Sequence, residues 1–202
     1  MGKYLKLFEQ HAQYEAYIGG GGAVLPNVSY CIDNDEVHYN PVIPETRLVA
    51  TFNVTDIAYP TNIIYFAGIS YMSKIEVDDT EISLEVLRQS YGSYQFDTTG
   101  EHTVKYTLID NSTMPESIFI VVDFTNIIIP SIITTIGADA FRGCSSLTSV
   151  TINATTPPTL MNSLAFDDTN DCPIYVPAQS VDTYKAASGW SSLASRIQAI
   201  QS

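Results

Sequence analysis

The chain has 202 residues, of which 45% are hydrophobic and only 15% charged, a composition typical of a folded protein rather than a disordered one. Its 13 tyrosines and 8 phenylalanines favour β-structure. Nine Lys and Arg against 22 Asp and Glu give a net charge of -13, which repels a phosphate backbone and excludes nucleic acid as an expected partner.

The N-terminal stretch is not expected to be an export signal. The apolar residues of MGKYLKLFEQHAQYEAYIGG are interrupted by Lys6, Glu9 and other polar residues, so the chain as written starts without a secretory signal. The longest apolar cluster, IFIVVDFTNIIIP, is broken by Asp123 and Asn126 and is too short to cross a bilayer as a helix. We therefore expect no membrane span.

Residues 1–40 are predicted to form a small α+β unit that attaches the chain to a larger assembly. KYLKLF alternates weakly like a strand, EQHAQYEAYI contains good helix formers, and NVSYCI and EVHYN are short β-prone runs around the turn-rich DNDE. Glycines 19–22 predict a loop rather than a phosphate cradle, because AVLPN follows them where a helix would be needed. YLKLFEQHAQYEAY and LPNVSYCIDNDEVHYNP resemble the N-terminal segment of proteins of gut anaerobes and their phages.

Residues 41–112 are predicted to form an immunoglobulin-like β-sandwich. RLVATFNVT, NIIYF, KIEV, EISLEVL, SYQF and HTVKYTLI have a period close to two and are separated by turn groups such as AYPTN, VDDT and DTTG. In HTVKYTL, the alternation predicts a half-buried strand with Val104, Tyr106 and Leu108 on its inner face. YQFDTTGEHTVKYTLID resembles the late strands of bacterial immunoglobulin-like and PKD-like domains.

Residues 113–202 are predicted to form a short leucine-rich-repeat solenoid. The stretch IGADAFRGCSSLTSVTI resembles the BspA-like leucine-rich repeat of bacterial surface proteins at Ile136, Gly137, Ala140, Phe141, Cys144, Leu147, Val150 and Ile152. The resemblance implies a coil of about 23 residues, whose interior is filled from the convex side and from a short inward-facing strand. One coil alone would leave both ends of its core open to water.

The spacing predicts one further coil, with a more divergent sequence, before and after the coil at residues 136–152. Ile127 lies 23 residues before Val150, and Ile174 follows 24 residues after it. We therefore expect a parallel ladder of residues 127–129, 150–152 and 174–176, with the rings of Phe119, Phe141 and Phe166 stacked in a column.

The two ends of the ladder are predicted to be covered by unlike neighbours. PAQSVDTYKAASGW predicts a C-terminal capping helix with Val181, Tyr184 and Ala187 on one face, and Trp190, Leu193 and Ile197 are predicted to form an apolar lid. IYVPAQSVDTYKAASGWSSLASRIQAI resembles the ending of many BspA-like proteins. The sandwich is expected to cover the other end.

No catalytic arrangement is found. HExxH, GxSxG, CxxC and Walker-type loops are absent, and His11, His38 and His102 lie in different segments. Cys31 and His38 could lie close across the DNDE turn, but thiolate catalysis needs a third orienting group and structural zinc needs four ligands. We predict a protein that is not an enzyme and has no cofactor.

Metal binding is not expected either. The acidic clusters DNDE (33–36) and DDTND (167–171) offer oxygen ligands but lack the spacing of an EF-hand, so solvated turns are predicted, with weak calcium binding as the alternative. The three cysteines are too few for a disulfide scaffold and are predicted to be small buried hydrophobes; they are Cys31, Cys144 and Cys172.

Tyrosines at turns are the candidate binding residues. Turn tips are where β-sandwiches present contact residues, and five tyrosines fall in or beside predicted turns, namely Tyr59, Tyr65, Tyr71, Tyr91 and Tyr94. On the ladder, Ile128, Thr151 and Tyr175 are predicted to point away from the core, which makes Tyr175 the sixth candidate binding residue. The alternative is that most of the five pack in the core or at strand edges.

These features predict a non-catalytic structural or interaction protein with a protein or glycan partner. The leading hypothesis is a phage virion surface protein, such as a head or tail fibre or decoration protein, and the absence of an export signal tilts towards it. The alternative is a BspA-like adhesin on the bacterial cell surface, and a third hypothesis is a hydrolase with a cleft between sandwich and solenoid. Exposed edge strands could pair copies into a homo-oligomer.

Overall fold

The structure is a computed structural model that describes residues 28–33, 36–41, 47–162 and 164–201. The chain divides into two compact units, Met1–Ile43 and Pro44–Ser202.

The first unit contains a β-hairpin. Strand β1 (Val28–Asp33) pairs antiparallel with β2 (Glu36–Pro41), and Cys31 stands opposite His38 in this register. The two later strands predicted for the N-terminal unit are thereby confirmed. The strand, the helix and the glycine loop predicted before them lie outside the described residues.

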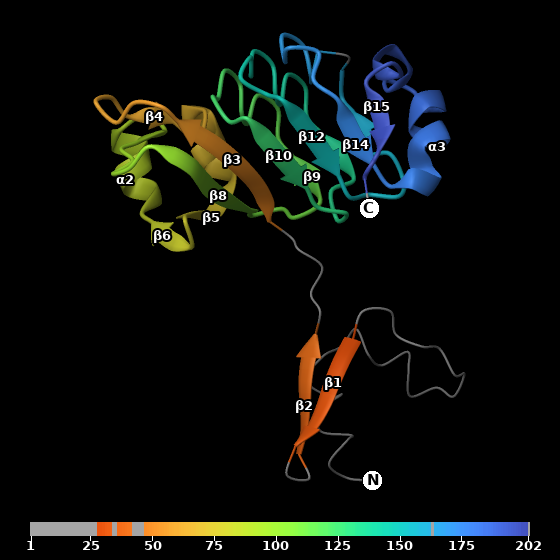
Figure 1. The fold of residues 1–202 in the computed structure, drawn as a ribbon, viewed down its shortest axis with the longest axis horizontal. Coiled ribbons are helices and arrows are strands. Elements are labelled where there is room, and N and C mark those ends of the chain that lie inside the picture. Colours follow the sequence, from red (N-terminus) through yellow and green to blue (C-terminus); the bar gives the residue numbers. More distant parts are fainter. Residues whose placement is uncertain (1–27, 34–35, 42–46, 163, 202) are drawn as a thin grey trace. The chain divides into compact units, whose positions relative to one another are not determined.

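The second unit is organised around one eight-stranded sheet with the strand order β15-β14-β12-β10-β3-β8-β5-β6 (Figure 1). Its antiparallel half consists of β3 (Leu48–Val54), β8 (Gly100–Leu108), β5 (Met72–Val77) and β6 (Thr80–Ile82). Its parallel half consists of β10 (Asn126–Ile129), β12 (Ser149–Ile152), β14 (Ile174–Val176) and β15 (Ile197–Ala199). The halves join where β10 pairs antiparallel with β3.

The parallel half confirms the predicted ladder. Ile127 is opposite Val150, which is in turn opposite Ile174, as the spacing of 23 and 24 residues requires. A second parallel ladder runs beside it in the order β13-β11-β9, formed by Thr159–Leu160, Thr135–Ile136 and Thr113–Met114. Each coil therefore contributes one strand to each ladder and packs directly against the next coil.

The rings of three phenylalanines stack along the interior, as predicted. The centroids of Phe119 and Phe141 are 5.8 Å apart, and those of Phe141 and Phe166 are 5.1 Å apart, with interplanar angles of 17° and 16°. All three side chains are buried. Because backbone N–H groups of Phe119 and Phe141 donate to carbonyls of the following coil, at Ala140 and Ala165, the stacked rings are held in register.

The predicted immunoglobulin-like sandwich over residues 41–112 is not confirmed. The predicted inner face of β8 is present, since Val104, Tyr106 and Leu108 are buried. However, the long strands of this range all lie in one sheet, and no second sheet of comparable strands is seen among the described residues. The other regular elements are the 3-10 helix η2 (Phe66–Tyr71), the helix α2 (Leu84–Gln89) and the short pair β4 (Thr61–Asn62) and β7 (Ser93–Tyr94).

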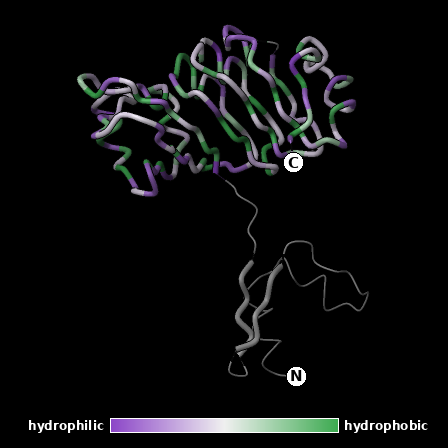
Figure 2. The backbone as a smooth tube through the Cα atoms, in the orientation of Figure 1, coloured by the Kyte–Doolittle hydropathy of each residue, from purple (hydrophilic) through white to green (hydrophobic). Residues whose placement is uncertain are grey.

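This region shares a core with the coils, so the predicted boundary at residue 112 falls within a single compact unit. Tyr106 of β8 packs its ring against Phe119 at 4.9 Å, and its hydroxyl donates to the carbonyl of Ile63. Phe52 of β3 packs against Phe124 at 5.9 Å. Figure 2 shows that hydrophobic residues recur along the strands of this unit. Burial of these residues away from water stabilises the core that the two halves share.

The C-terminal segment covers the far end of the ladder, as predicted. Helix α3 (Val181–Ala186) follows η3 (Ala178–Ser180), and η4 (Ser191–Leu193) leads to β15. Tyr184 and Trp190 are buried, and they donate hydrogen bonds to the carbonyls of Ala154 and Pro158, respectively. Trp190 also continues the aromatic column, 5.9 Å from Phe166. Ile197 does more than act as a lid, because it belongs to a fourth parallel strand.

Candidate interaction surface

Four of the six predicted binding tyrosines have substantially exposed side chains. Tyr59 is 76% exposed in the loop after β3, and Tyr91 is 75% exposed after α2. Tyr65 and Tyr71 flank or end η2 and are exposed to 41% and 45%. The predicted presentation of aromatic side chains at turns is therefore seen for these four residues, although their binding role stays a prediction.

The other two predicted tyrosines are half-buried and lie elsewhere. Tyr94 of β7 packs its ring against Phe96, with centroids 5.0 Å apart, so it has the packing role that the sequence left as the alternative. Tyr175 of β14 lies on the outward face of the sheet, beside Thr151 and Gln198 of the neighbouring strands.

The structure brings Tyr91 together with a residue that the sequence did not single out, Phe66. Their ring centroids are 5.6 Å apart, and Phe66 is 47% exposed. The two segments are joined because the carbonyl of Gly92 accepts hydrogen bonds from the N–H groups of Ile63 and Ile64. We call Phe66 and Tyr91 the aromatic pair. The run NIIYF was interpreted as a strand, and no signal in it distinguished an exposed Phe66 from a buried one.

Tyr91 is held outward by an unusual backbone conformation. Its φ is 54° and that of Gly92 is 86°, so the chain turns through the left-handed region directly after α2. A Cβ at position 92 would lie 2.0 Å from the carbonyl oxygen of Ile64, so only glycine fits there. A bulky residue at positive φ lowers the stability of the fold. For Tyr91 this cost is not offset by burial, because its ring stays exposed to water. This combination makes the aromatic pair the strongest candidate for contact with another molecule.

A second surface is the outward face of the eight-stranded sheet. The strand registers align one residue from each strand in a continuous line that we call the central row, running through Glu81, Glu76, Lys105, Val49, Ile128, Thr151, Tyr175 and Gln198. The row on the opposite face is apolar and buried. The central row is charged over the antiparallel half except at Val49, and it is uncharged over the parallel half, where Ile128 is 40% exposed.

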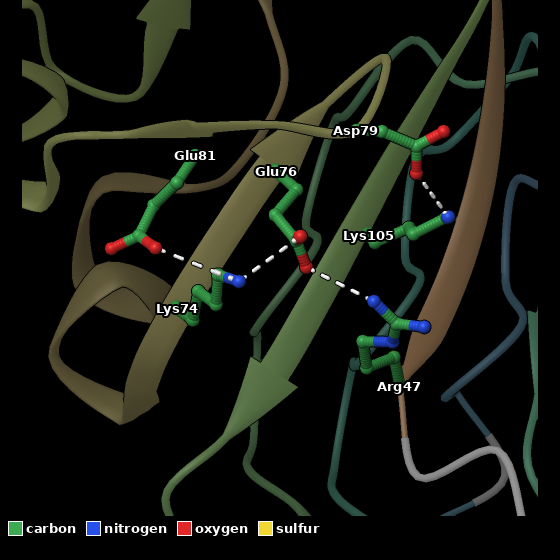
Figure 3. A network of polar contacts seen from close by, with 6 residues as sticks. All are labelled: Arg47, Lys74, Glu76, Asp79, Glu81 and Lys105. Carbon is green, nitrogen blue, oxygen red and sulfur yellow. Dashed lines mark hydrogen bonds and ion pairs between the residues drawn. The ribbon is translucent and has the colours of Figure 1, made fainter.

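A network of ion pairs organises the charged end of this face (Figure 3). Glu76 is only 8% exposed, and its carboxylate oxygens lie 3.1 Å from the guanidinium of Arg47 and 3.0 Å from the ammonium of Lys74. Lys74 also reaches Glu81 at 3.5 Å, and Lys105 pairs with Asp79.

The network sets the protonation of its central carboxylate. The hydrogen bond from Lys74, together with that from Arg47, lowers the pKa of Glu76 below its ordinary value against the opposing effect of burial. The same contact raises the pKa of Lys74. Among the described residues, three cations and three carboxylates pair in this network.

The cysteines are structural where the structure describes them. Cys144 and Cys172 are buried free thiols, and burial raises the pKa of both, that of Cys144 to about 12. Thiols with raised pKa values are poor nucleophiles, which agrees with the prediction that they are small buried hydrophobes. For Cys31, only the backbone register opposite His38 is described.

The acidic loop 167–171 adjoins a surface cavity of about 460 Å³ that is also lined by Arg196. This arginine donates to the carbonyls of Phe166 and Cys172 and to the hydroxyl of Thr169, and so fastens the loop to the start of β15. Within the described ranges, no group of three or more His, Cys, Asp or Glu side chains is placed to hold a metal ion. None of the helices in those ranges is long and apolar enough to cross a membrane.

Comparison with known families bears on the coils. Residues 112–188 match the family described as a BspA type leucine rich repeat region (6 copies). No curated protein matches the chain. The part of the chain that contains the stacked coils is therefore a BspA-type leucine-rich repeat region, as its residues predicted.

Proposed function

We propose that this chain is a non-catalytic interaction protein on the surface of a phage virion, with a protein or glycan partner. The observation that carries the interaction role is the BspA-type repeat region at 112–188, a type of module suited to surface recognition. The resemblance of the N-terminal segment to proteins of gut anaerobes and their phages favours a virion. The alternative is an adhesin on the bacterial cell surface, which the kinship of the repeat with bacterial surface proteins favours.

The aromatic pair is the proposed contact point for the partner. Aromatic side chains supply a large contact area with few rotatable bonds, and they are enriched among the residues that dominate binding energy at interfaces. Phe66 and Tyr91 are already in ring contact, so little further ordering is needed when a partner covers them. Tyr65 and Tyr71 are two further exposed rings, at the start and the end of η2.

Location distinguishes the two hypotheses. Quantitative mass spectrometry of purified virions and of outer-membrane fractions should find the chain in stoichiometric amounts in virions. Enrichment in the outer-membrane fraction instead would favour the adhesin. Recovery only from the soluble cell interior would contradict both.

The contact point is tested with variants of the full-length chain. In a competition assay, the added wild-type protein should block attachment of virions or cells to their target, and the double variant Phe66→Ala/Tyr91→Ala should be at least about tenfold weaker. Ile109→Ala is the matched control, because Ile109 is a large side chain that is 68% exposed and is not among the candidate binding residues. Equal loss in the control would show that the pair has no special role.

A further inference from the structure

His102 has hydrogen-bond acceptors at both ring nitrogens. Its side chain on β8 is 9% exposed, Nδ1 lies 2.7 Å from a carboxylate oxygen of Asp78, and Nε2 lies 2.9 Å from the backbone carbonyl oxygen of Thr98. A neutral imidazole carries one N–H and can donate to only one of them, whereas the imidazolium donates to both. The site is therefore built for the charged ring.

The two acceptors belong to different segments. Asp78 lies in the turn between β5 and β6, at a φ of 47°, and its other carboxylate oxygen accepts the backbone N–H of Thr103 at 2.9 Å. Thr98 ends the stretch that runs from β7 into β8, and Phe96 of this stretch packs against the His102 ring at 4.5 Å. His102 thus connects the turn at 78–79 to the segment 94–98.

The charged groups that the structure places at the His102 ring are acidic, whereas Glu101 and Lys105 lie on the outward face of β8. Asp78 contacts the ring directly, and Asp97 lines the same surface cavity of about 330 Å³. Asp79 of the same turn is paired with Lys105, and Glu101 precedes His102 on the strand. From β3, the residue opposite His102 is Phe52, which is uncharged.

We propose that His102 is a pH-sensitive latch that holds segment 94–98 against the β5–β6 turn when its ring is protonated and releases it when the ring becomes neutral. In the neutral form the proton stays at Nδ1 facing Asp78, and Nε2 presents a lone pair to the carbonyl of Thr98. The hydroxyl of Thr98 lies 3.4 Å from Nε2 and is the alternative donor to this lone pair, but the carbonyl oxygen of Thr98 lies closer, at 2.9 Å, and is repelled by it. The latch acts on the segment that includes Tyr94, independently of the function proposed above.

The direction of the pH dependence follows from the site. The hydrogen bond to Asp78 raises the pKa of His102 against the opposing effect of burial, and the carbonyl of Thr98 adds to the rise. A raised folded-state pKa contributes stability that is complete below the unfolded value of about 6.5 and is lost as pH rises through the folded value. The latch is therefore closed at mildly acidic pH, and it opens when the pH rises above the folded-state pKa of His102.

The titration of His102 tests the first half of the proposal. In the full chain carrying His11→Gln and His38→Gln, the remaining imidazole signals in an NMR titration belong to His102. We expect them to titrate above pH 6.5, and the further change Asp78→Asn to bring the pKa down. A pKa at or below 6.5, or one that Asp78→Asn leaves in place, would overturn the proposal.

Amide hydrogen exchange tests the release. At each pH, the exchange rates of residues 94–98 are measured in the wild type and in the His102→Gln variant. Taking the ratio of the two rates removes the intrinsic pH dependence of exchange. Protection relative to the variant should fall about tenfold as His102 loses its proton, since a charge-assisted hydrogen bond is worth about that factor. Asp97→Asn should retain this change, because Asp97 is not a hydrogen-bond partner in the latch. A constant ratio across the titration would show that His102 is only a packed side chain.

Discussion

The ring planes of Phe119 and Phe141 are 17° from parallel, with centroids 5.8 Å apart, although the two residues are 22 positions apart in the chain. Phe166 and Trp190 continue the same line of contacts to the C-terminal cap, and Tyr106 meets it from the antiparallel half. One aromatic column therefore links the antiparallel strands, three coils and the cap. Since the antiparallel half, the coils and the cap all contribute rings to it, we expect the second unit to unfold cooperatively.

Phe141 is the central ring of this column and the first target for mutation. Phe141→Ala should lower the free energy of unfolding by about 3–5 kcal/mol, because it removes a buried ring and leaves a cavity between two others. Phe141→Leu should cost less, since it fills part of the space. Urea titrations followed by circular dichroism measure both, with Tyr59→Ala as the exposed control. A cost below about 1 kcal/mol for the alanine variant would contradict a tightly packed column.

Gly137 should not tolerate a side chain. A Cβ at this position would lie 2.4 Å from the backbone N of Glu116 and 2.4 Å from the carbonyl carbon of Pro115, so neighbouring coils would have to separate. We expect Gly137→Ala to destabilise the second unit by about 2 kcal/mol or more. Ser131→Ala, at an exposed position, is the control. Equal thermal midpoints for the two variants would show that the coils are not held so closely.

Replacing Val121 with glycine should stabilise the second unit. This β-branched residue has a φ of 57° and a side chain that is 60% exposed, while the equivalent position of the next coil is Gly143, with a φ of 74°. Val121→Gly relieves strain of about 1–3 kcal/mol and loses part of it to the greater freedom of the unfolded chain. We expect a net gain of about 0.5–1 kcal/mol.

The matched control for Val121→Gly is Ile109→Gly. Ile109 is 68% exposed and is not among the described residues with positive φ, so glycine should give no gain there. Chemical denaturation of both variants measures the difference. Destabilisation by Val121→Gly would mean that its exposed side chain contributes more than its backbone strain costs.

Glu76 should make stability depend on pH in the acid range. Its folded-state pKa is lowered by Lys74 and Arg47, so its contribution is complete above the unfolded value of about 4.3 and is lost as pH falls through the folded value. The urea midpoint of Glu76→Gln should lie below that of the wild type at pH 7, and the two should converge towards pH 3. Glu81→Gln, which changes a 67% exposed carboxylate, should have a smaller effect. A constant gap between wild type and Glu76→Gln would exclude an ionic contribution.

The coils were predictable because their signal is local and repeated. Pairs of isoleucine and valine recur at 23 and 24 residues, and each coil packs chiefly against its sequence neighbours, so spacing alone identifies which strands pair. The capping role of Tyr184 and Trp190 followed from the need to cover an apolar end. The exposure of Tyr59 and Tyr91 followed from their place in turns.

The antiparallel half was less predictable, because a period of two identifies the inner face of a strand but not its partner. The alternation in β8 correctly placed Val104, Tyr106 and Leu108 inside, yet it is compatible with a sandwich as well as with a single sheet. Nothing local indicated that β3 would pair with β10 across more than seventy residues. Likewise, Phe66 meets Tyr91, and His102 meets Asp78, only through pairings between segments distant in sequence.

The amino-acid sequence by itself determined the repeat, the buried faces and the two closed ends, because each depends on the spacing of apolar residues along a short stretch of chain. Only the tertiary structure decided that the antiparallel strands extend the ladder as one sheet, that two aromatic rings meet in solvent and that an imidazole lies between two acceptors. These depend on contacts between distant segments, which form when the whole core is assembled and which no local pattern specifies.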